Sequence, residues 1–404
     1  MAKKLLTSVM TVALCLFIIF KNNNILEDTS VVDASETFLK FEILSNSTAK
    51  VIYYPNGEGV SFNISYYGYD SITIPEKVRI DGKVYTVTSI GRSAFYNDKL
   101  TYVNIPKSVT NIEEMAFCDC RSLTGINIPE GVTSIGKSAF AGCNSLEPSL
   151  LIYDKGTKCY GWIGNEKKCI EVVIPESVTS IGAVAFGGCS SLTSINIPEG
   201  VTSIGESAFG GCSSLESGLL IYDKGTKCYG WIGDNNKCTD VVIPDGVKSI
   251  GVQAFWGESL TSIKLPEGLT SIGEAAFSGC MSLTSINIPK GVTSIGERTF
   301  YECYRLSSVK LPEELISIRE DAFRYCETLT CINIPESVTR IGTSAFEGCN
   351  SLTSLTIPKS VTSIEADAFY ACKKLDIKID NSKENVEVGT NAFEGCKSVT
   401  WLKE

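Results

Sequence analysis

Cysteine is the residue type with the greatest chemical potential in this sequence, because the 404 residues include 17 Cys and no His. Without histidine the chain can form no Ser-His-Asp triad, no Cys-His dyad and no zinc site with imidazole ligands. No Cys-x-x-Cys pair occurs either, so the spacing does not favour a zinc site built from thiolates. Disulfides and buried thiols are the roles that remain.

Ten cysteines follow a recurring phenylalanine by three positions. A cysteine tied to a repeat in this way is typical of a small buried side chain, so we expect a column of stacked thiols. Asp98 and Glu258 take its place in two further repeats. The ten cysteines are Cys120, Cys143, Cys189, Cys212, Cys280, Cys303, Cys326, Cys349, Cys372 and Cys396.

Two further cysteine pairs, Cys159/Cys169 and Cys228/Cys238, have a different setting. Each pair is symmetric about a polar segment, which is 164–166 in the first pair. A hairpin turn there would place the two cysteines of a pair opposite each other. This arrangement predicts a disulfide in each pair, with buried free thiols as the alternative.

Two aromatic clusters are candidates for ligand recognition. They lie in residues 150–164 and 219–233, which share the sequence LLIYDKGTKCYGWIG. Exposed Tyr and Trp on a rigid scaffold make binding hot spots, and they could also stack on sugar rings. The alternative is that they fill space in irregular coils. The clusters comprise Tyr153, Tyr160 and Trp162, and then Tyr222, Tyr229 and Trp231.

A 23-residue repeat must position all of these groups. Its clearest marker is an Ile-Pro or Leu-Pro dipeptide, which recurs once per repeat except where one repeat diverges and the spacing doubles. The 69-residue offset of the aromatic clusters equals three repeats, so the duplication preserves the phase. The prolines are Pro75, Pro106, Pro129, Pro175, Pro198, Pro244, Pro266, Pro289, Pro312, Pro335 and Pro358.

Residues 189–211, CSSLTSINIPEGVTSIGESAFGG, indicate the structure of one repeat. Alternating Ile195 and Ile197 predict a strand, which Pro198 ends in a turn. A second short extended piece follows, and then a compact return formed by turns or 3₁₀ helix. The positions expected to face inward are Leu192, Ile195, Ile197, Val201, Ile204, Ala208, Phe209 and Cys212.

One such coil cannot bury its apolar side chains alone, whereas stacked coils can. The repeats therefore predict one β-rich solenoid of short parallel strands, although the length alone would suggest two or three domains. About fourteen coils would make a curved rod with a face roughly 65 Å long. The divergent coils fall near residues 146–174 and 215–243.

The pattern C-x-x-L-x-x-I-x-I-P-x-x-V-x-x-I-G-x-x-A-F-x-x-C resembles the BspA-like, or treponemal-type, leucine-rich repeat. The resemblance covers about residues 71–400. It implies a leucine-rich repeat solenoid in a secreted or cell-surface protein, and an adhesin-like role. Fold alone does not fix that function.

The chain divides into three predicted segments. Residues 1–34 combine Lys3 and Lys4 with the unbroken apolar run Val9–Phe20, and indicate a signal peptide or an uncleaved N-terminal anchor. Residues 35–70 contain strand-like alternation and predict a small β cap on the first coil. Residues 71–404 form the solenoid.

Outward side chains on the strand before each proline are candidates for contact with a ligand. We expect them on the concave face, where repeated small polar groups either keep the surface soluble or build a recognition surface. The candidates are Asn127, Asn196, Lys264, Asn287, Lys310 and Asn333.

The net charge of −10 argues against a nucleic-acid partner. The carboxylates are spread over coil turns instead of forming a facing pair, so the sequence does not favour a glycosidase or another enzyme. We expect no cofactor and no metal. The leading hypothesis is a secreted or cell-surface adhesion protein that binds a host or neighbouring-cell protein. A self-associating surface component and a carbohydrate-binding module are alternatives.

Overall fold

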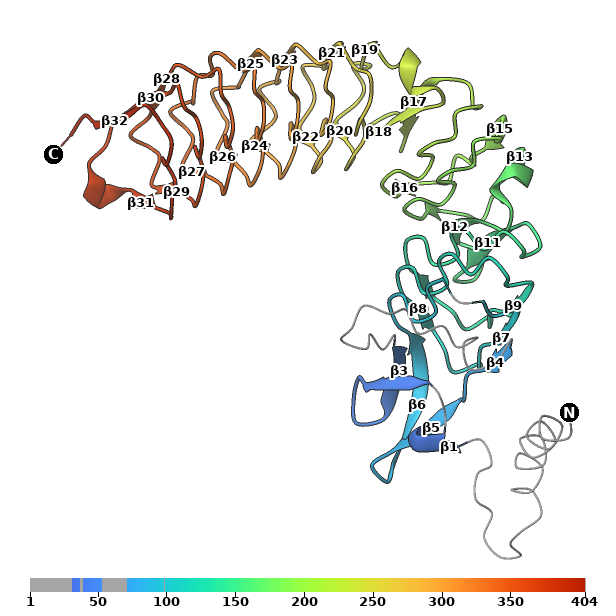
Figure 1. Cartoon of the computed structure of the whole chain (residues 1–404). Coiled ribbons are helices and arrows are strands. Elements are labelled where there is room, and N and C mark those ends of the chain that lie inside the picture. The colour runs from blue at the N-terminus through green and yellow to red at the C-terminus, as the bar shows by residue number, and fades with distance from the viewer. Residues whose placement is uncertain (1–30, 37–38, 53–70, 98, 404) are drawn as a thin grey trace, which may run out of the picture.

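The computed structural model describes residues 31–36, 39–52, 71–97 and 99–403. It is a bent solenoid in which a regular coil adds one strand to an outer face, before its proline, and one to an inner face, after it (Figure 1). The coil at residues 331–333 is an exception on the outer face, where Cys331 makes a single bridge to Ser308. The predicted β-rich solenoid is therefore confirmed. The apolar segment Val9–Phe20, on which the predicted leader rests, lies outside the described residues.

The outer strands are β4 (Ser71–Thr73), β7 (Tyr102–Asn104), β9 (Gly125–Asn127), β13 (Glu171–Val173), β15 (Ser194–Asn196), β19 (Asp240–Val242), β21 (Ser262–Lys264), β23 (Ser285–Asn287), β25 (Ser308–Lys310), β28 (Ser354–Ile357), β30 (Asp376–Ile379) and β32 (Ser398–Trp401). The inner strands are β8 (Asn111–Ile112), β10 (Ser134–Ile135), β14 (Ser180–Ile181), β16 (Ser203–Ile204), β20 (Ser249–Ile250), β22 (Ser271–Ile272), β24 (Ser294–Ile295), β26 (Ser317–Ile318), β27 (Arg340–Ile341), β29 (Ser363–Ile364) and β31 (Glu387–Val388).

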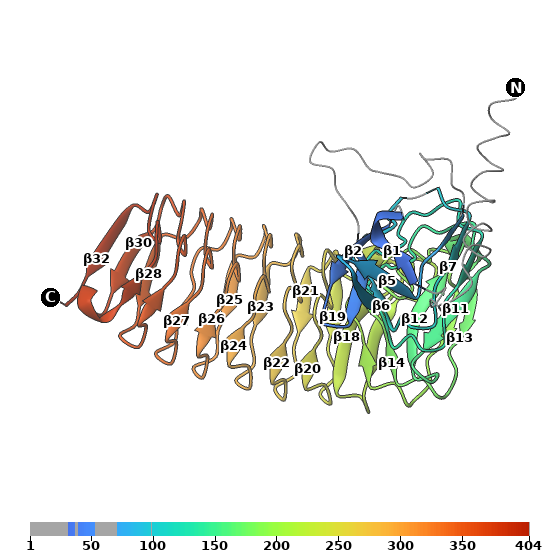
Figure 2. The ribbon, with the colours of Figure 1, turned by 90° about the horizontal axis from the view of Figure 1, so that it is seen from below.

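Neighbouring coils pair in parallel and in the register of the repeat. In β23 and β25, Ile286 lies opposite Val309 and Asn287 lies opposite Lys310. Since successive side chains of a strand point to opposite faces, Ile286 is buried and Asn287 is exposed. One coil therefore repeats the burial of the next, and the view from below shows the succession of coils from β19 to β32 (Figure 2).

The return segment of each coil carries a stacked phenylalanine. The rings of Phe323 and Phe346 are parallel within 11°, with centroids 5.2 Å apart, and both side chains are fully buried. The backbone runs alongside in a third ladder, in which the N–H of Phe323 donates to the carbonyl of Ala345 in the next coil at 2.8 Å. These returns consist of turns. The 3₁₀ segments are η1 (Ala34–Glu36), η3 (Glu166–Lys168), η4 (Asn235–Lys237) and η5 (Lys383–Asn385).

Both divergent coils form antiparallel hairpins. The first consists of β11 (Ser149–Tyr153) and β12 (Lys158–Ile163), and the second of β17 (Gly218–Tyr222) and β18 (Lys227–Ile232). On their C-terminal side, β12 and β18 pair in parallel with the inner strands β14 and β20. The divergent coils thus stay in phase with the coils that follow them.

The hairpins divide the solenoid into three blocks: the N-terminal block up to residue 143, the middle block 149–212 and the C-terminal block 218–403. We call the boundaries the first and second joints. Within the described residues, no backbone–backbone hydrogen bond crosses either joint. The buried core also falls into three clusters that meet near the two hairpins. Figure 1 shows the solenoid changing direction near the second hairpin.

Side chains bridge the joints instead. Lys137 in the N-terminal block forms an ion pair of 2.5 Å with Glu206 in the middle block. At the second joint the Ser207 hydroxyl lies 3.2 Å from the side-chain oxygen of Gln253 and donates to it. Each contact joins coils on opposite sides of a divergent hairpin. The two joints therefore have the same backbone pairing, but an ion pair spans the first and a hydrogen bond between side chains spans the second.

A β cap precedes the coils, as predicted, but it begins earlier than residue 35. It comprises β1 (Val31–Asp33), β2 (Lys40–Ile43), β3 (Thr48–Ile52), β5 (Lys77–Ile80) and β6 (Lys83–Ile90). The strands follow the order β1-β5-β6-β3-β2, and β6 also pairs with β8 of the solenoid. The boundary predicted at residue 34 is wrong in this respect, because apolar Val32 pairs with Val78 inside the cap sheet.

Two further expectations need correction. The outer strands lie along the outer side of the bend in Figure 1, and the inner strands lie along its concave side. Both faces of a coil are sheets with the same strand spacing, so the repeat alone does not decide which of them is concave. Ile195 and Ile197 are only partly buried, because none of the described strands covers β15 on the side of the second joint.

Candidate binding surfaces

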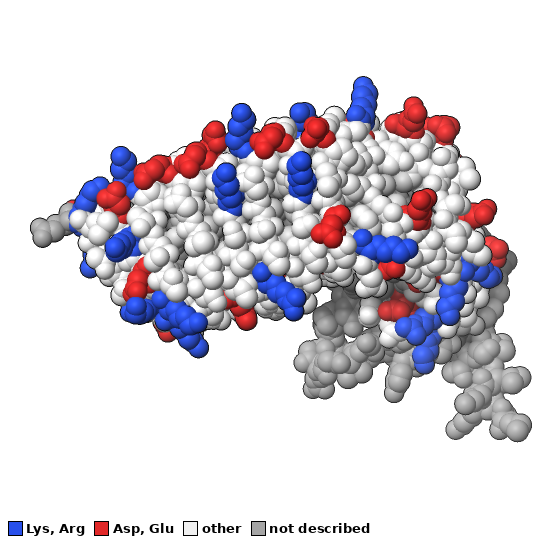
Figure 3. All heavy atoms as spheres, turned by 90° about the horizontal axis from the view of Figure 1, so that it is seen from above, with Lys and Arg blue, Asp and Glu red and all other residues white. Residues whose placement is uncertain are grey.

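The candidate side chains of the outer strands form an exposed column along the solenoid. Asn196, Lys264, Asn287, Lys310 and Asn333 are all exposed, although on the outer and not the concave side. The corresponding surface of the C-terminal block is broad and largely uncharged, with a row of charged side chains along one edge and a few Lys or Arg side chains on the face itself (Figure 3). This face can offer a partner hydrogen bonds over several coils.

Asn127 belongs to the same column but is used internally. Its amide Nδ2 donates to the carbonyl of Ile105 at 3.0 Å, and its Oδ1 accepts the Ile105 N–H at 2.7 Å. The side chain thus continues the hydrogen bonding between β7 and β9. It is less available to a ligand than the other members of the column.

The two aromatic clusters lie at the joints and are half-buried. The Tyr153 hydroxyl donates to the Ile128 carbonyl at 2.9 Å, and the Tyr160 hydroxyl donates to the Thr133 carbonyl at 2.8 Å. Both acceptors belong to the last coil of the N-terminal block. Burial raises the pKa of both tyrosines, consistent with phenol groups that stay neutral.

The second cluster repeats this arrangement. Tyr222 donates to the carbonyl of Ile197 at 3.4 Å, and Tyr229 donates to that of Thr202 at 3.1 Å. The indole N–H groups of Trp162 and Trp231 donate to backbone carbonyls three positions ahead. All six polar groups of the clusters therefore have partners inside the chain, and the tyrosines tie consecutive blocks together.

The geometry predicted for the paired cysteines is wrong. The hairpin turns at residues 154–157, not at 164–166, and the cross-strand partner of Cys159 is Ile152. Residues 166–168 form η3 instead, with the Asn165 side chain capping its start. Cys159, Cys169, Cys228 and Cys238 are buried free thiols in the structure.

The repeat-tied cysteines form the predicted column. Typical of them is Cys326, a fully buried thiol that donates to the carbonyl of Phe300 at 3.2 Å. Burial raises the pKa of Cys303 to about 12 and that of Cys159 to about 11. Such thiols stay protonated near neutral pH, which makes them poor nucleophiles and poor metal ligands.

Glu258 is the exception in this column. It is buried in the first regular coil after the second joint, and its Oε2 has no hydrogen-bond partner among the described residues. Burial raises the pKa of its carboxyl to about 7. Burial and, to a smaller degree, the Glu258 charge also raise the pKa of Cys238 and Cys280 on either side. The sequence shows the substitution but not the buried, unpaired carboxyl that results from it.

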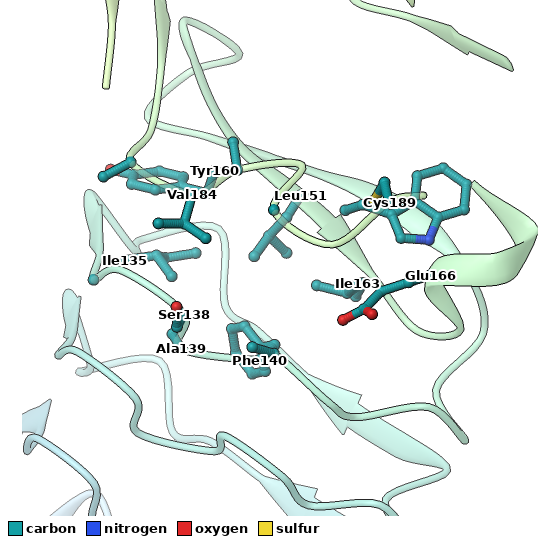
Figure 4. Close-up of a pocket in the computed structure, with 16 residues that line it drawn as sticks. Ile135, Ser138, Ala139, Phe140, Leu151, Tyr160, Ile163, Glu166, Val184 and Cys189 are labelled. Carbon is teal, nitrogen blue, oxygen red and sulfur yellow. The ribbon is translucent and has the colours of Figure 1, made fainter. Parts of the chain in front are cut away.

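A small cavity opens at the first joint, where the divergent coil supplies no phenylalanine between Phe140 and Phe186 (Figure 4). Ile135, Leu151, Tyr160 and Val184 line it, together with the Glu166 carboxylate. Its volume of about 50 Å³ admits a few water molecules and no ordinary metabolite. The cavity is a packing defect of the joint and not a substrate pocket.

Two other classes of site find no support in the described part of the chain. Among the described residues, no group of three or more Cys, Asp or Glu is arranged to hold a metal ion. No helix within the described ranges is long and apolar enough to cross a membrane.

Comparison with known proteins identifies the repeat. The model of the BspA type leucine rich repeat region matches residues 164–222, 233–351 and 316–403, more than half of the chain. The chain belongs to the BspA-type leucine-rich repeat family. A search of curated proteins finds no match.

Solved structures that match this chain include leucine-rich repeat proteins of bacteria. One from Eubacterium ventriosum has a TM-score of 0.51 at 21% identity, and the match covers 89% of this chain and 92% of that one. A Bacteroides ovatus protein has 26% identity and a TM-score of 0.42, with coverage of 90% and 98%. A leucine rich cell surface protein from Faecalibacterium prausnitzii has 26% identity and a TM-score of 0.40, with coverage of 90% and 97%.

Membership of the BspA-type family accounts for the regular coils, whose repeated apolar positions are used for packing. The two joints are the places where the chain departs from the regular coil. Their tyrosines, unpaired strand edges and bridges are set by the duplicated hairpins. We therefore consider the outer face and the joints together as the candidate binding surfaces.

Proposed function

We propose that this BspA-type protein is secreted or displayed at a cell surface, where its outer face binds a protein of a host or of a neighbouring cell without catalysis. One observation carries the proposal: a rigid solenoid repeats the same exposed polar positions, among them Lys264, Asn287 and Lys310, over consecutive coils. Extended repetitive surfaces of this kind are what solenoid proteins use for binding.

Two features support this assignment over the alternatives. The aromatic clusters, whose residue types favour a carbohydrate module, direct their polar groups to their own backbone. The apolar run in Val9–Phe20, with Lys3 and Lys4 before it, supports export. Partners would be extracellular proteins, and a membrane would be contacted only through the N-terminal segment.

The test is affinity capture with the exported chain against extracellular-matrix and cell-surface proteins, followed by calorimetry with each purified partner. We expect the double variant K264E/K310E to weaken binding at least tenfold. The matched variant K290E makes the same Lys-to-Glu change at an exposed turn and should bind normally. Failure to capture any specific partner, together with reversible self-association in sedimentation, would instead support a structural surface component.

A further inference from the structure

The outer sheet is interrupted at each joint. Among the described strands, β9 and β13 lie two repeats apart and do not pair, and the same holds for β15 and β19. In the regular coils the repeat contributes one strand to this face, except that the coil at residues 331–333 makes only a single bridge, from Cys331 to Ser308, and that β21 and β23 do not pair. At the joints the gap is wider, because one repeat contributes no outer strand and no backbone–backbone hydrogen bond among the described residues crosses it. Each divergent coil instead adds its strands next to the inner sheet, where β11-β12-β14-β16 form one sheet. Two gaps in strand pairing therefore interrupt the outer face, and we call these gaps, between β9 and β13 and between β15 and β19, the first and second grooves.

Both edges of the first groove present backbone groups without a partner. In regular coils the N–H of a residue such as Thr193 donates to the coil before it, here to the Ile170 carbonyl at 2.8 Å. Within the described residues, the N–H groups of Glu171 and Val173 donate to no backbone or side-chain acceptor. On the opposite edge, the carbonyl of Ile126 accepts none of the described hydrogen bonds.

The second groove, formed by the second copy of the duplication, has the same edges. Among the described hydrogen bonds, none uses the N–H groups of Asp240 and Val242 or the carbonyl of Ile195. Each side of a parallel strand carries the N–H and C=O groups of alternate residues, and each edge of a groove presents groups of both kinds. An extended strand would therefore find hydrogen bonds on both of its sides.

The side chains around the grooves show that apolar cover is missing. Ile126 and Ile195 occupy inward positions next to the grooves but are only partly buried. The equivalent Ile286, which has a strand on the next coil, is 4% exposed. Val173 and Val242, on the other edges, are 71% and 64% exposed, and these are the largest values for big apolar residues in the described chain.

From this geometry we infer that each groove binds one extended polypeptide strand of a partner protein, which completes the outer sheet. The inserted strand places alternate apolar side chains over Ile126 or Ile195 and its other side chains outward. Glu171 and Asp240 on the outward row favour a partner with Lys or Arg at the adjacent position. The inference rests on the proposed protein-binding function and names the place and the kind of ligand.

Two identical grooves on one rigid rod also explain why the duplication matters. A partner with two suitable strands, or two copies of one partner, can occupy both, and tethering raises the apparent affinity without any new contact. The spacing is fixed by the middle block, from β13 to β15. A single groove would lack this advantage.

A peptide with the sequence of a regular outer strand, LTSINIPEG from residues 192–200, is the direct probe. Titrated calorimetrically into the full chain, it should bind with a stoichiometry of two. The control peptide is N-methylated at its Ser and Asn, whose N–H groups point to the preceding coil in a regular strand. We expect at least tenfold weaker binding of the control, and equal binding of the two peptides would overturn the inference.

Variants of the chain locate the site. V173P/V242P removes one of the two N–H groups that face each groove without removing bonds to β15 or β21. The matched variant V173T/V242T keeps these N–H groups and introduces Thr, which the repeat itself has at Thr356. We expect V173P/V242P to lose at least tenfold in peptide affinity and V173T/V242T to lose threefold or less. Binding that survives V173P/V242P in a chain with normal circular dichroism would refute the strand-addition site.

Hydrogen exchange separates this inference from the proposed function. Bound peptide should slow exchange of the amides of Glu171, Val173, Asp240 and Val242, and leave those of β23 unchanged. A captured partner that binds V173P/V242P as well as the unmodified chain would leave protein binding standing and remove the grooves from it. If the peptide protects these amides but no partner protein binds the chain, the grooves stand and the proposed function falls.

Discussion

The regular coils and the joints connect neighbouring parts of the solenoid in different ways. Between regular coils of one block, a return ladder of backbone hydrogen bonds and a phenylalanine stack connect neighbouring coils, as between Phe323 and Phe346. In most places the outer and inner strands pair as well. Across a joint, side chains alone make the described hydrogen bonds, such as that from Tyr160 to the Thr133 carbonyl. The backbone therefore holds each block together, and a few side chains hold the blocks to one another.

This difference shows how a repeat protein acquires local features without losing its fold. Inside a block most strands of the regular coils pair with both neighbouring coils, and where they do not, as between β21 and β23, the return ladder still connects the coils. A joint breaks all three ladders on one side of a hairpin while the hairpin pairs normally on the other. The result is a pair of grooves at which no backbone ladder connects the neighbouring blocks among the described residues, and we expect lower local stability there.

We expect the largest effect on folding from the choice of deletion end points. A deletion of one whole duplicated unit should be tolerated, and a deletion that leaves an incomplete hairpin should not. Removing residues 150–218, one full length of the duplication, replaces the first hairpin by the second in the same phase. We expect a folded, shorter solenoid with unchanged β content by circular dichroism and one peptide-binding groove instead of two. Removing residues 150–229 also deletes β17 and half of β18, which leaves the C-terminal block uncovered. That chain should aggregate, and equal behaviour of the two deletions would contradict the block structure.

Phenylalanine truncation compares the middle of a block with its edge. Phe323 is stacked on both sides, on Phe300 and Phe346, whereas Phe140 stacks on one described phenylalanine, Phe117. F323A should lower the free energy of unfolding by about 3–5 kcal/mol, because it leaves a cavity between two fixed rings. F140A lies beside the small cavity of the first joint and should cost less. Urea denaturation followed by circular dichroism measures both, and a larger loss for F140A would contradict the comparison.

Because Glu258 lies next to the second joint only, we expect the stability of the chain near that joint to depend on pH. Burial raises the pKa of its carboxyl to about 7, above the unfolded value of 4.5, so the folded state favours the protonated form. The associated stability is complete below pH 4.5 and is lost as the pH rises toward and through 7. We expect E258Q to remove this pH dependence and to stabilise the chain at pH 8 by about 2 kcal/mol.

The matched variant for this test is E274Q, because Glu274 is exposed one coil away. Thermal unfolding at pH 4.5, 6 and 8 should show a falling melting temperature for the unmodified chain and for E274Q. A profile for E258Q that falls in parallel with them would show that Glu258 does not carry the effect.

The sequence predicts the regular coils well because every coil carries the same pattern. In each regular coil a proline such as Pro198 marks the end of a strand, an apolar residue such as Ile286 marks an inward position, and a phenylalanine such as Phe323 marks the return segment. These positions recur at the spacing of the repeat. The BspA-type pattern and the buried cysteine column follow from this periodicity. The exposed column of Asn and Lys also follows, since outward positions alternate with inward ones.

The joints could not be predicted in the same way, because hydrogen bonding between distant segments decides them. The phase of the repeat runs unbroken through residues 150–164, so nothing in the sequence indicates that β9 and β13 fail to pair. The polar residues 164–166 predict a hairpin turn, whereas the Asp-Lys-Gly-Thr turn at 154–157 forms it. Partial exposure of Ile195 follows from a missing neighbour and not from its own surroundings in the sequence.

The smallest expected effect comes from the tyrosine hydroxyls that donate across the joints, because each can be removed as a single oxygen atom. Their removal tests whether the joints are weaker than the contacts between regular coils. Y160F and Y229F each delete a hydroxyl that donates across a joint, to Thr133 and Thr202 respectively. Each should lower stability by about 1 kcal/mol, the usual net value of one hydrogen bond, and Y370F, which alters a tyrosine away from the joints, should have almost no effect. Hydrogen exchange should then speed up in the hairpins before it does in β23 and β25, because the blocks separate more readily while their ladders remain intact. Uniform acceleration across all coils would mean that the solenoid opens as one unit and that the joints are no weaker than the coils they connect.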